Sequence, residues 1–69
     1  MEKMYKRIKI LRKEKNLKQI EAAELLDISI TSYCRYERGE REPGAALLWR
    51  MADLFGVSVD YLIGRTDER

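Results

Sequence analysis

The segment from residue 29 to residue 38 combines a cation, hydroxyl groups and small apolar side chains on one predicted helix face. If Tyr33 and Tyr36 form its inward apolar pair, at spacing i, i+3, other side chains point outward. The residues that then face largely outward are Ile30, Thr31, Cys34 and Arg35. An arginine can bond O6 and N7 of guanine, a threonine can donate or accept a hydrogen bond, and an isoleucine can contact the methyl group of thymine. A helix face that is merely solvated more usually carries glutamate and lysine, so this face is predicted to contact base edges.

Residue types that serve enzyme or metal chemistry are scarce. The sequence contains no histidine, one cysteine, no glycine-rich phosphate loop and no cluster of carboxylates, so the usual acid, base and metal constellations are absent. Cys34 could be a nucleophile, but no base accompanies it in the pattern, and an outward or half-buried helix side chain is the simpler interpretation. We therefore expect no enzyme, no cofactor, no metal ion and no small-molecule ligand.

Positive charge is concentrated near the N-terminus. The net charge is only +2, but residues 1–18 carry eight basic residues against Glu2 and Glu14. A basic helix face of this kind is either an ordinary solvated surface or a surface for phosphate. The charge alone does not decide between them.

The length and hydropathy of the chain limit the class of protein. A chain of 69 residues can make one domain. No apolar run approaches the ~20 residues of a membrane span, and the start MEKMYKRIK lacks the apolar core of a signal peptide. We expect a soluble, cytoplasmic protein with no membrane contact.

Hydrophobic periodicity predicts the first helix. Met4, Ile8 and Leu11 recur at i, i+4 and i+7 with basic residues between them, so a helix is expected from Glu2 to Lys15. Asn16 suits a left-handed helix end.

Two short helices joined by a tight connection follow. One is expected from about residue 18 to residue 26, with Ala22, Ala23 and Leu26 on its inner side. The next is expected from residue 30 to residue 38, since Ser29 is a good N-cap and Gly39 suits a left-handed end. Such a pair is typical of a helix-turn-helix, here at about residues 18–38, in which the first helix braces the second and the second enters the major groove.

Two further helices complete the expected fold. Pro43 marks a loop, and a run of apolar residues at i, i+3, i+4 and i+7 then predicts a fourth helix that Gly56 closes. The apolar residues are Leu48, Met51, Ala52 and Phe55. Ser58 can cap a fifth short helix that ends at Gly64. The expected fold is all-α, with five short helices in one domain.

Short motifs occur in a fixed order along nearly the whole chain. They are Arg12, Leu17-Lys18-Gln19, Ala23 and Leu26, Ile28-Ser29, Arg35-Tyr36-Glu37-Arg38-Gly39, Arg41-Glu42-Pro43, and the run from Ala52-Asp53 through Gly56-Val57-Ser58 to Asp60-Tyr61-Leu62. Together they resemble the Xre family of regulators, the group of phage Cro and lambda repressor-type DNA-binding domains. The resemblance implies a single lambda repressor-like domain over residues 1–69, with its core at 7–64, that binds double-stranded DNA sequence-specifically as a transcriptional regulator, with repression as the expected effect.

The resemblance also implies which residues contact DNA. Ile30, Thr31 and Arg35 match the positions from which the family usually reads bases, and Ser29 and Ser32 could reach a phosphate or a base.

Other positions match contacts to the DNA backbone. Gln19 matches a family glutamine that bonds a phosphate and can brace a side chain of the recognition helix, although a glutamine at a helix start can also simply be solvated. Lys18 precedes it and is assigned to the same DNA-binding set. Arg38 and Arg41 match backbone-contacting positions.

Two positions match a structural pair, and two depart from the family pattern. Arg12 and Glu37 match a partly buried ion pair that ties the first helix to the end of the third. Asp27 stands where the family usually has glycine in the turn, and Glu40 stands where a basic residue is common. The second departure puts one phosphate contact in doubt.

The functional partner is expected to be a pseudo-palindromic operator bound by a homodimer. One small module offers few base contacts, too few to discriminate against ~10⁶ competing genomic sites, whereas two linked half-sites multiply the discrimination. The interface is assigned to Val57, Val59 and Tyr61, which could instead only cap the core. A rival function is a protein-interaction module on the same fold, such as an antitoxin or anti-repressor, for which Trp49 and Leu25 supply apolar surface.

Overall fold

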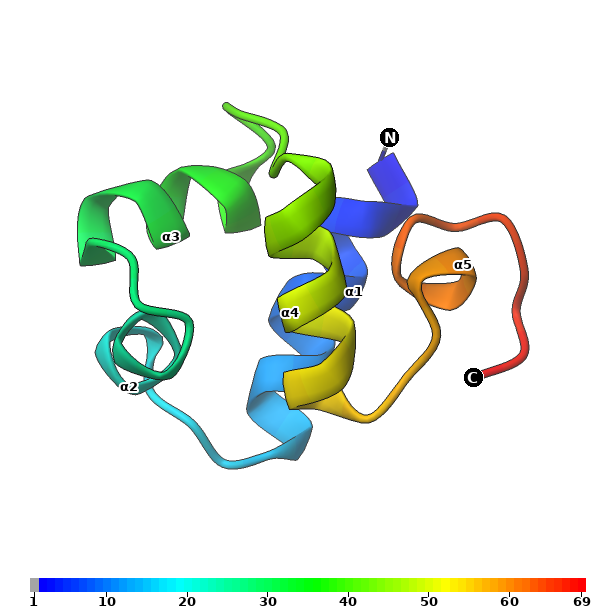
Figure 1. Cartoon of the computed structure of the whole chain (residues 1–69), viewed down its shortest axis with the longest axis horizontal. Helices are drawn as coiled ribbons and strands as arrows, with labels where there is room; N and C mark the ends of the chain where they lie inside the picture. Colours follow the sequence, from blue (N-terminus) through cyan, green and yellow to red (C-terminus); the bar gives the residue numbers. More distant parts are fainter. Residues whose placement is uncertain (1) are drawn as a thin grey trace.

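The computed structural model describes residues 2–69 of the chain, and these residues form five α-helices and no strand. The helices are α1 (Glu2–Glu14), α2 (Gln19–Leu25), α3 (Ile30–Arg38), α4 (Ala45–Phe55) and α5 (Val59–Leu62). In Figure 1, α1 and α4 cross at the centre, α2 and α3 lie on one side of them, and α5 lies on the other side. The all-α fold with five short helices that the sequence predicts is confirmed.

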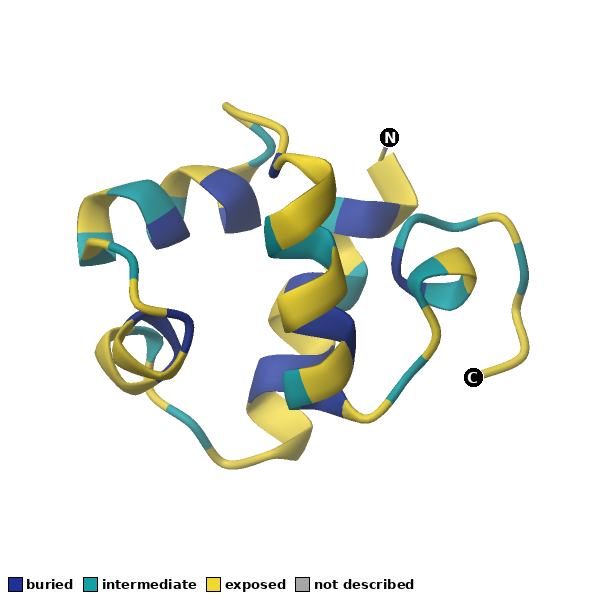
Figure 2. Cartoon of the chain, in the orientation of Figure 1, coloured by how far each residue is buried: buried dark blue, intermediate teal, exposed yellow. Residues whose placement is uncertain are grey.

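The core forms where the apolar stripes of the helices meet. Figure 2 shows the buried positions on the sides of the helices that face one another. The buried apolar residues are Met4, Ile8, Leu11, Ala22, Ala23, Leu26, Tyr33, Tyr36, Met51, Ala52, Phe55 and Leu62. The predicted stripes of the first three helices are therefore all buried, and in α4 only Leu48 remains half-buried at the edge of the core.

Three residues set the tight connection between α2 and α3 and the end of α3. Asp27 has a φ of 58°, which Asp tolerates better than most residues because its short polar side chain can bond locally. Ser29 caps α3, since its Oγ accepts a hydrogen bond from the Ser32 N–H at 3.1 Å. Gly39 closes α3 with a φ of 75°, and a Cβ at this position would lie 2.4 Å from Cδ2 of Tyr5. Glycine is therefore required here both by the backbone and by the neighbouring ring.

The bounds of α3 are as the sequence predicts, those of α1 and α2 differ by one residue, and α5 ends at Leu62, two residues before the predicted end at Gly64. The sequence predicts α1 to Lys15, but α1 ends at Glu14 and Asn16 turns the chain with a φ of 57°. The Leu17 N–H then donates to the Arg12 carbonyl at 3.2 Å, so the chain folds back on the helix just closed. Lys18 is the N-cap residue of α2, and its N–H donates to Oε1 of Glu21 at 2.8 Å.

No helix within residues 2–69 has the length and apolar character that crossing a membrane requires.

Candidate nucleic-acid interface

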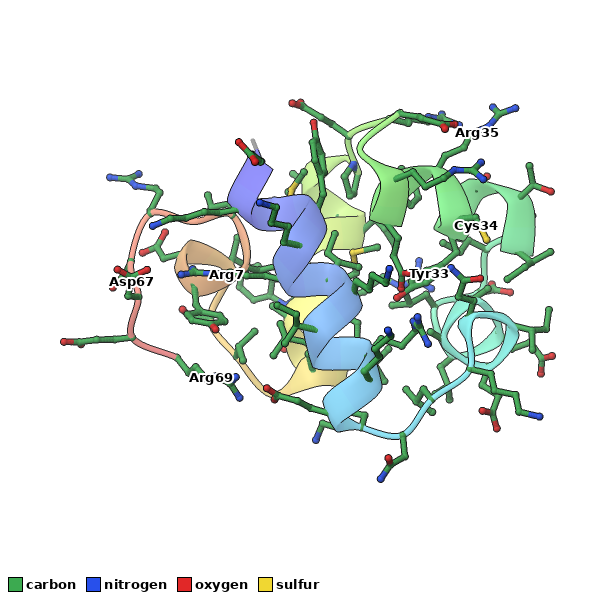
Figure 3. All side chains as sticks on the ribbon, turned by 180° about the vertical axis from the view of Figure 1, so that it is seen from behind. Arg7, Tyr33, Cys34, Arg35, Asp67 and Arg69 are labelled. Atoms are coloured by element: carbon green, nitrogen blue, oxygen red, sulfur yellow. The ribbon has the colours of Figure 1, made fainter. Side chains whose placement is uncertain are left out.

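One face of α3 is exposed and carries polar and cationic side chains. Thr31, Arg35 and Arg38 occur at i, i+4 and i+7, so they lie in one stripe, and all three are exposed. Figure 3 shows the side chain of Arg35 directed away from the body of the molecule and that of Tyr33 directed into it. The predicted outward face of α3 is therefore present, with a hydroxyl group and two guanidinium groups in a row.

Two residues expected on this face are only half-exposed, which corrects the prediction from an ideal helix. Ile30 packs against the core, and Cys34 lies on the side of α3 toward α2, where its Sγ is 3.5 Å from Oε1 of Gln19. Cys34 is partly covered because α2 packs against α3 on that flank, and Ile30 is partly covered because it joins the edge of the core. Ser32 is also half-buried, and the exposed Ser29 already uses its Oγ as the cap of α3.

A buried ion pair ties α3 to α1. Nε of Arg12 lies 2.6 Å from Oε2 of Glu37, and Nη2 lies 3.4 Å from Oε1. The side chains are 10% and 3% exposed, so water does not compete for these contacts. The third Arg12 nitrogen, Nη1, donates to the Leu17 carbonyl at 2.7 Å. The ion pair between the first helix and the end of the third that the resemblance implies is thus present.

The protonation states of this pair follow from its surroundings. Burial alone would raise the pKa of Glu37, but the hydrogen bonds from Arg12 and Gln19 outweigh burial and bring that pKa below its ordinary value. The hydrogen bond to Glu37 raises the pKa of Arg12. Burial raises the pKa of the Tyr33 hydroxyl, and the neighbouring Glu37 carboxylate acts in the same direction. That hydroxyl has no hydrogen-bond partner within residues 2–69.

Gln19 links α2 to α3. Its Nε2 donates to Oε1 of Glu37 at 3.1 Å, and its Oε1 faces the thiol of Cys34. The side-chain amide therefore braces α3 from the start of α2, which is one of the two roles that the resemblance implies. The other role, a contact with phosphate, stays a prediction. Lys18 is exposed beside it.

The loop after α3 contributes charges of both signs. Arg41 and Glu42 are exposed, and neither Arg35 nor Arg41 makes an ion pair within the described part of the chain. Arg38 does make one, since its Nε lies 3.0 Å from Oε2 of Glu40. Sequence reasoning singled out Glu40 as a departure but missed this pairing. The available signal was the spacing of two residues across a helix end that turns at Gly39.

The three residues assigned to a dimer interface are half-buried and pack against the core. Val57 and Val59 line a surface hollow of about 330 Å³ together with Trp49, and Tyr61 does not line it. The ring of Tyr61 instead lies under the guanidinium of Arg7, 3.9 Å from it. Two of the three assigned residues therefore share the hollow, and Tyr61 lies outside it.

The segment 65–69 contributes contacts near α5 that sequence reasoning missed. Nη1 of Arg7 donates to the carbonyl of Thr66 at 2.7 Å, and Nη2 lies 2.5 Å from Oδ1 of Asp67. The guanidinium of Arg69 meets both carboxylate oxygens of Glu14 at 2.7 Å. Figure 3 shows Arg7, Asp67 and Arg69 at this end of the molecule, away from Arg35. No sequence pattern pairs residues so far apart along the chain.

Comparison with known proteins places this arrangement in a family. The model of the helix-turn-helix family matches residues 8–62. The chain is 39% identical over 62 residues to the HTH-type transcriptional regulator ImmR of Bacillus subtilis, covering 90% of this chain and 49% of ImmR. It is 41% identical over 68 residues to the cryptic phage CTXphi transcriptional repressor RstR of Vibrio cholerae, covering 96% of this chain and 61% of RstR. The chain thus spans about half to three fifths of the length of these relatives.

A solved structure has the same fold. The P22 c2 repressor protein, crystallised in complex with a synthetic operator, superimposes with a TM-score of 0.81 and 29% identity, covering 86% of this chain and 89% of the repressor chain. The family match covers α2 and α3 together with the helices that support them. The chain therefore belongs to the helix-turn-helix family, in the Xre group of phage Cro and lambda repressor-type domains.

Proposed function

We propose that this chain binds double-stranded DNA sequence-specifically and regulates transcription, with α3 in the major groove. The observation that carries the proposal is the exposed stripe of Thr31, Arg35 and Arg38 on a helix that Gln19 and Arg12 hold from beneath. A protruding, braced helix with such side chains fits the width of the groove and the pattern of acceptors on base edges. The P22 c2 repressor supports the proposal, because that protein is bound to its operator in a similar fold.

The exposed residues are assigned to two kinds of DNA group, base edges and phosphates. Arg35 is central in the stripe and makes no ion pair within residues 2–69, so we assign it to guanine, with Thr31 beside it. Three further exposed cations are assigned to phosphates: Lys18 at the start of α2, Arg38 at the end of α3 and Arg41 in the loop that follows.

Four further residues are half-buried or already hydrogen-bonded, and they are assigned fewer DNA contacts. Ile30 and Ser32 are half-buried at the start of α3, where they suit contacts with a thymine methyl group and with a phosphate. Ser29 can donate its hydroxyl hydrogen to a phosphate only by giving up its bond to the Oγ of Ser32. Gln19 offers phosphate mainly its backbone N–H, because its side-chain amide already braces α3.

The proposed assembly is a homodimer on a pseudo-palindromic operator. Two copies of α3 would then lie about one DNA turn apart, roughly 34 Å, and the two half-sites would multiply the discrimination of one module. The proposed interface includes Val57, Val59 and Tyr61. The hollow lined by Val57, Val59 and Trp49 supports the first two positions, because it leaves apolar surface open beside α5. Repression is the proposed effect, by occupation of the operator in the cytoplasm.

A protein-interaction module is the second candidate, and one observation favours it. The large apolar side chains of Leu25 and Trp49 are 61% and 66% exposed. Exposed apolar side chains can mark a contact with another protein. This candidate predicts no binding to duplex DNA even at low salt.

The test is selection of bound sequences from a randomised duplex pool, with the Arg35→Ala variant as a matched control. Enrichment of a symmetric motif by the wild-type chain, with a relaxed motif for the variant, supports the proposal and gives the stoichiometry. Failure to enrich any sequence, together with no shift of random duplex at low salt, would overturn it in favour of the interaction module.

A further inference from the structure

A second arginine–glutamate pair is exposed at the C-terminal end of α3, where Arg38 is the last residue of the exposed stripe. Nε of Arg38 is 3.0 Å from Oε2 of Glu40, and Nη2 is 3.4 Å from Oε1. Both carboxylate oxygens therefore face the guanidinium. The side chains are 61% and 53% exposed, so solvent and any bound molecule can reach both of them.

The backbone fixes Glu40 in this place. Gly39 turns the chain with a left-handed φ of 75°, and the Glu40 N–H then donates to the Arg35 carbonyl at 3.0 Å. Residue 40 is thus held against the last turn of α3, which carries Arg38. The end of the helix therefore keeps the two side chains within reach of each other.

A guanidinium recognises a carboxylate and a phosphate in the same way, with a fork of two N–H donors. The donors that Arg38 gives to Glu40 are therefore the donors that a DNA phosphate would use. An exposed ion pair is weak, so exchanging its carboxylate for a phosphate costs little but not nothing. The carboxylate that is displaced also stays near the negatively charged backbone.

We propose that Glu40 is an internal substitute for a DNA phosphate, which holds Arg38 before DNA binds and lowers the affinity for every duplex. This inference rests on the proposed function and deepens it, because it names the residue that limits the strength of the backbone contact. Phosphate contacts carry no sequence information, so Glu40 sets the affinity of the site and leaves its base preference unchanged.

The first test compares two variants with the same change in charge. Glu40→Gln frees Arg38, whereas Glu42→Gln removes a charge from the same exposed loop at a residue that makes no ion pair within residues 2–69. Binding to a labelled mixed-sequence duplex is measured by fluorescence anisotropy across a series of salt concentrations. We expect Glu40→Gln to bind about threefold to tenfold more tightly, with a salt slope steeper by up to about one, and Glu42→Gln to gain no more than about twofold.

The second test asks whether Glu40 acts through Arg38. In an Arg38→Ala background, adding Glu40→Gln should give no more gain than adding Glu42→Gln. An equal gain from Glu40→Gln with and without Arg38 overturns the inference, since Glu40 then acts only by its own repulsion of the phosphates. Equal effects of the two glutamine variants in the wild-type background overturn it as well.

The outcome for the wild-type chain separates this inference from the proposed function. If the wild type binds duplex DNA but Glu40→Gln changes nothing, only the inference fails. If neither the wild type nor any variant binds duplex DNA at low salt, the proposed function fails and takes the inference with it. Circular dichroism of each variant verifies that the helices are intact.

Discussion

The two sides of α3 carry the same chemistry in opposite settings. On the inner side Glu37 pairs with Arg12 and is 3% exposed, and on the outer side Arg38 pairs with Glu40 and is 61% exposed. The two residues Glu37 and Arg38 are neighbours in the sequence. Burial, and not the identity of the charges, therefore decides whether an ion pair serves the fold or is available for exchange with a ligand.

Additional hydrogen bonds hold the buried pair of Arg12 and Glu37 in place. Glu37 also accepts from Gln19, and Arg12 also donates to the Leu17 carbonyl, so three parts of the chain meet at one carboxylate and one guanidinium. A buried charge that loses its partner has no water to replace it. The outer pair can exchange its partner for water or phosphate at small cost.

The largest expected effect is a loss of protein stability when the pair of Arg12 with Glu37 is broken. Arg12→Ala and Glu37→Ala should each lower the free energy of unfolding by ~3 kcal/mol, because each strands a buried charge. The double variant should lose less than the sum of the two single variants. Urea melts of the four proteins measure this. Additive losses would contradict the contrast between the two sides, because they would mean that the inner pair behaves as a solvated one.

The next effect is on binding and leaves stability unchanged. Arg35→Ala should weaken binding to the selected operator by ~1–3 kcal/mol and relax the preference at one base pair of each half-site. Arg41→Ala serves as the control, since a phosphate contact should be lost equally on selected and random duplexes, with a salt slope shallower by roughly one. Titrations on both duplexes make the comparison. Equal losses on both for Arg35→Ala would move Arg35 to the phosphate-contacting class.

Sequence patterns predicted the inner side of α3 better than its outer side. Tyr33 and Tyr36 follow helical spacing, and Gly39 ends the helix, because local periodicity and backbone preference act within a few residues. The pairing of Arg12 with Glu37 came from the family resemblance, since no local rule joins residues 25 positions apart.

The contacts that the sequence did not predict depend mostly on how the helices pack against one another. The sequence predicts Ile30 and Cys34 to face outward, but Ile30 packs against the core and Cys34 faces Gln19 of α2. The contact of Arg38 with Glu40 depends on the turn at Gly39, and the stacking of Arg7 on Tyr61 depends on the fold of α5 against α1. The cover over Cys34 and the stacking of Arg7 on Tyr61 are set by tertiary packing, which one sequence without its structure does not specify. The contact of Arg38 with Glu40 is local, so its signal lies in the sequence around Gly39.

A smaller effect is expected in acid, and its sign follows from the pKa of Glu37. The hydrogen bonds to Glu37 hold its pKa below the ordinary 4.5, so its contribution to stability is complete above about pH 4.5 and is lost as the pH falls through the folded-state pKa. Glu37→Gln should therefore be less stable at pH 7 and lose less stability than the wild type on acidification. Urea melts at a series of pH values test this. The exposed carboxylates are common to both proteins, so parallel pH profiles would show that Glu37 does not titrate as a buried, paired group.

The smallest expected effect is a change in protein stability when the pair of Arg38 with Glu40 is broken. Arg38→Ala, Glu40→Ala and the double variant should each change the free energy of unfolding by ~0–1 kcal/mol, because both side chains are largely solvated and ordering them opposes the gain from their attraction. The coupling between the two residues should shrink as salt is raised, whereas the coupling between Arg12 and Glu37 should persist, because buried charges are screened much less than exposed ones. Double-mutant cycles by urea melt at low and high salt measure both couplings on the same scale. If the outer coupling matched the inner one and resisted salt, Arg38 would be held too firmly to exchange Glu40 for a phosphate, and the two sides of α3 would not differ in the way that their burial predicts.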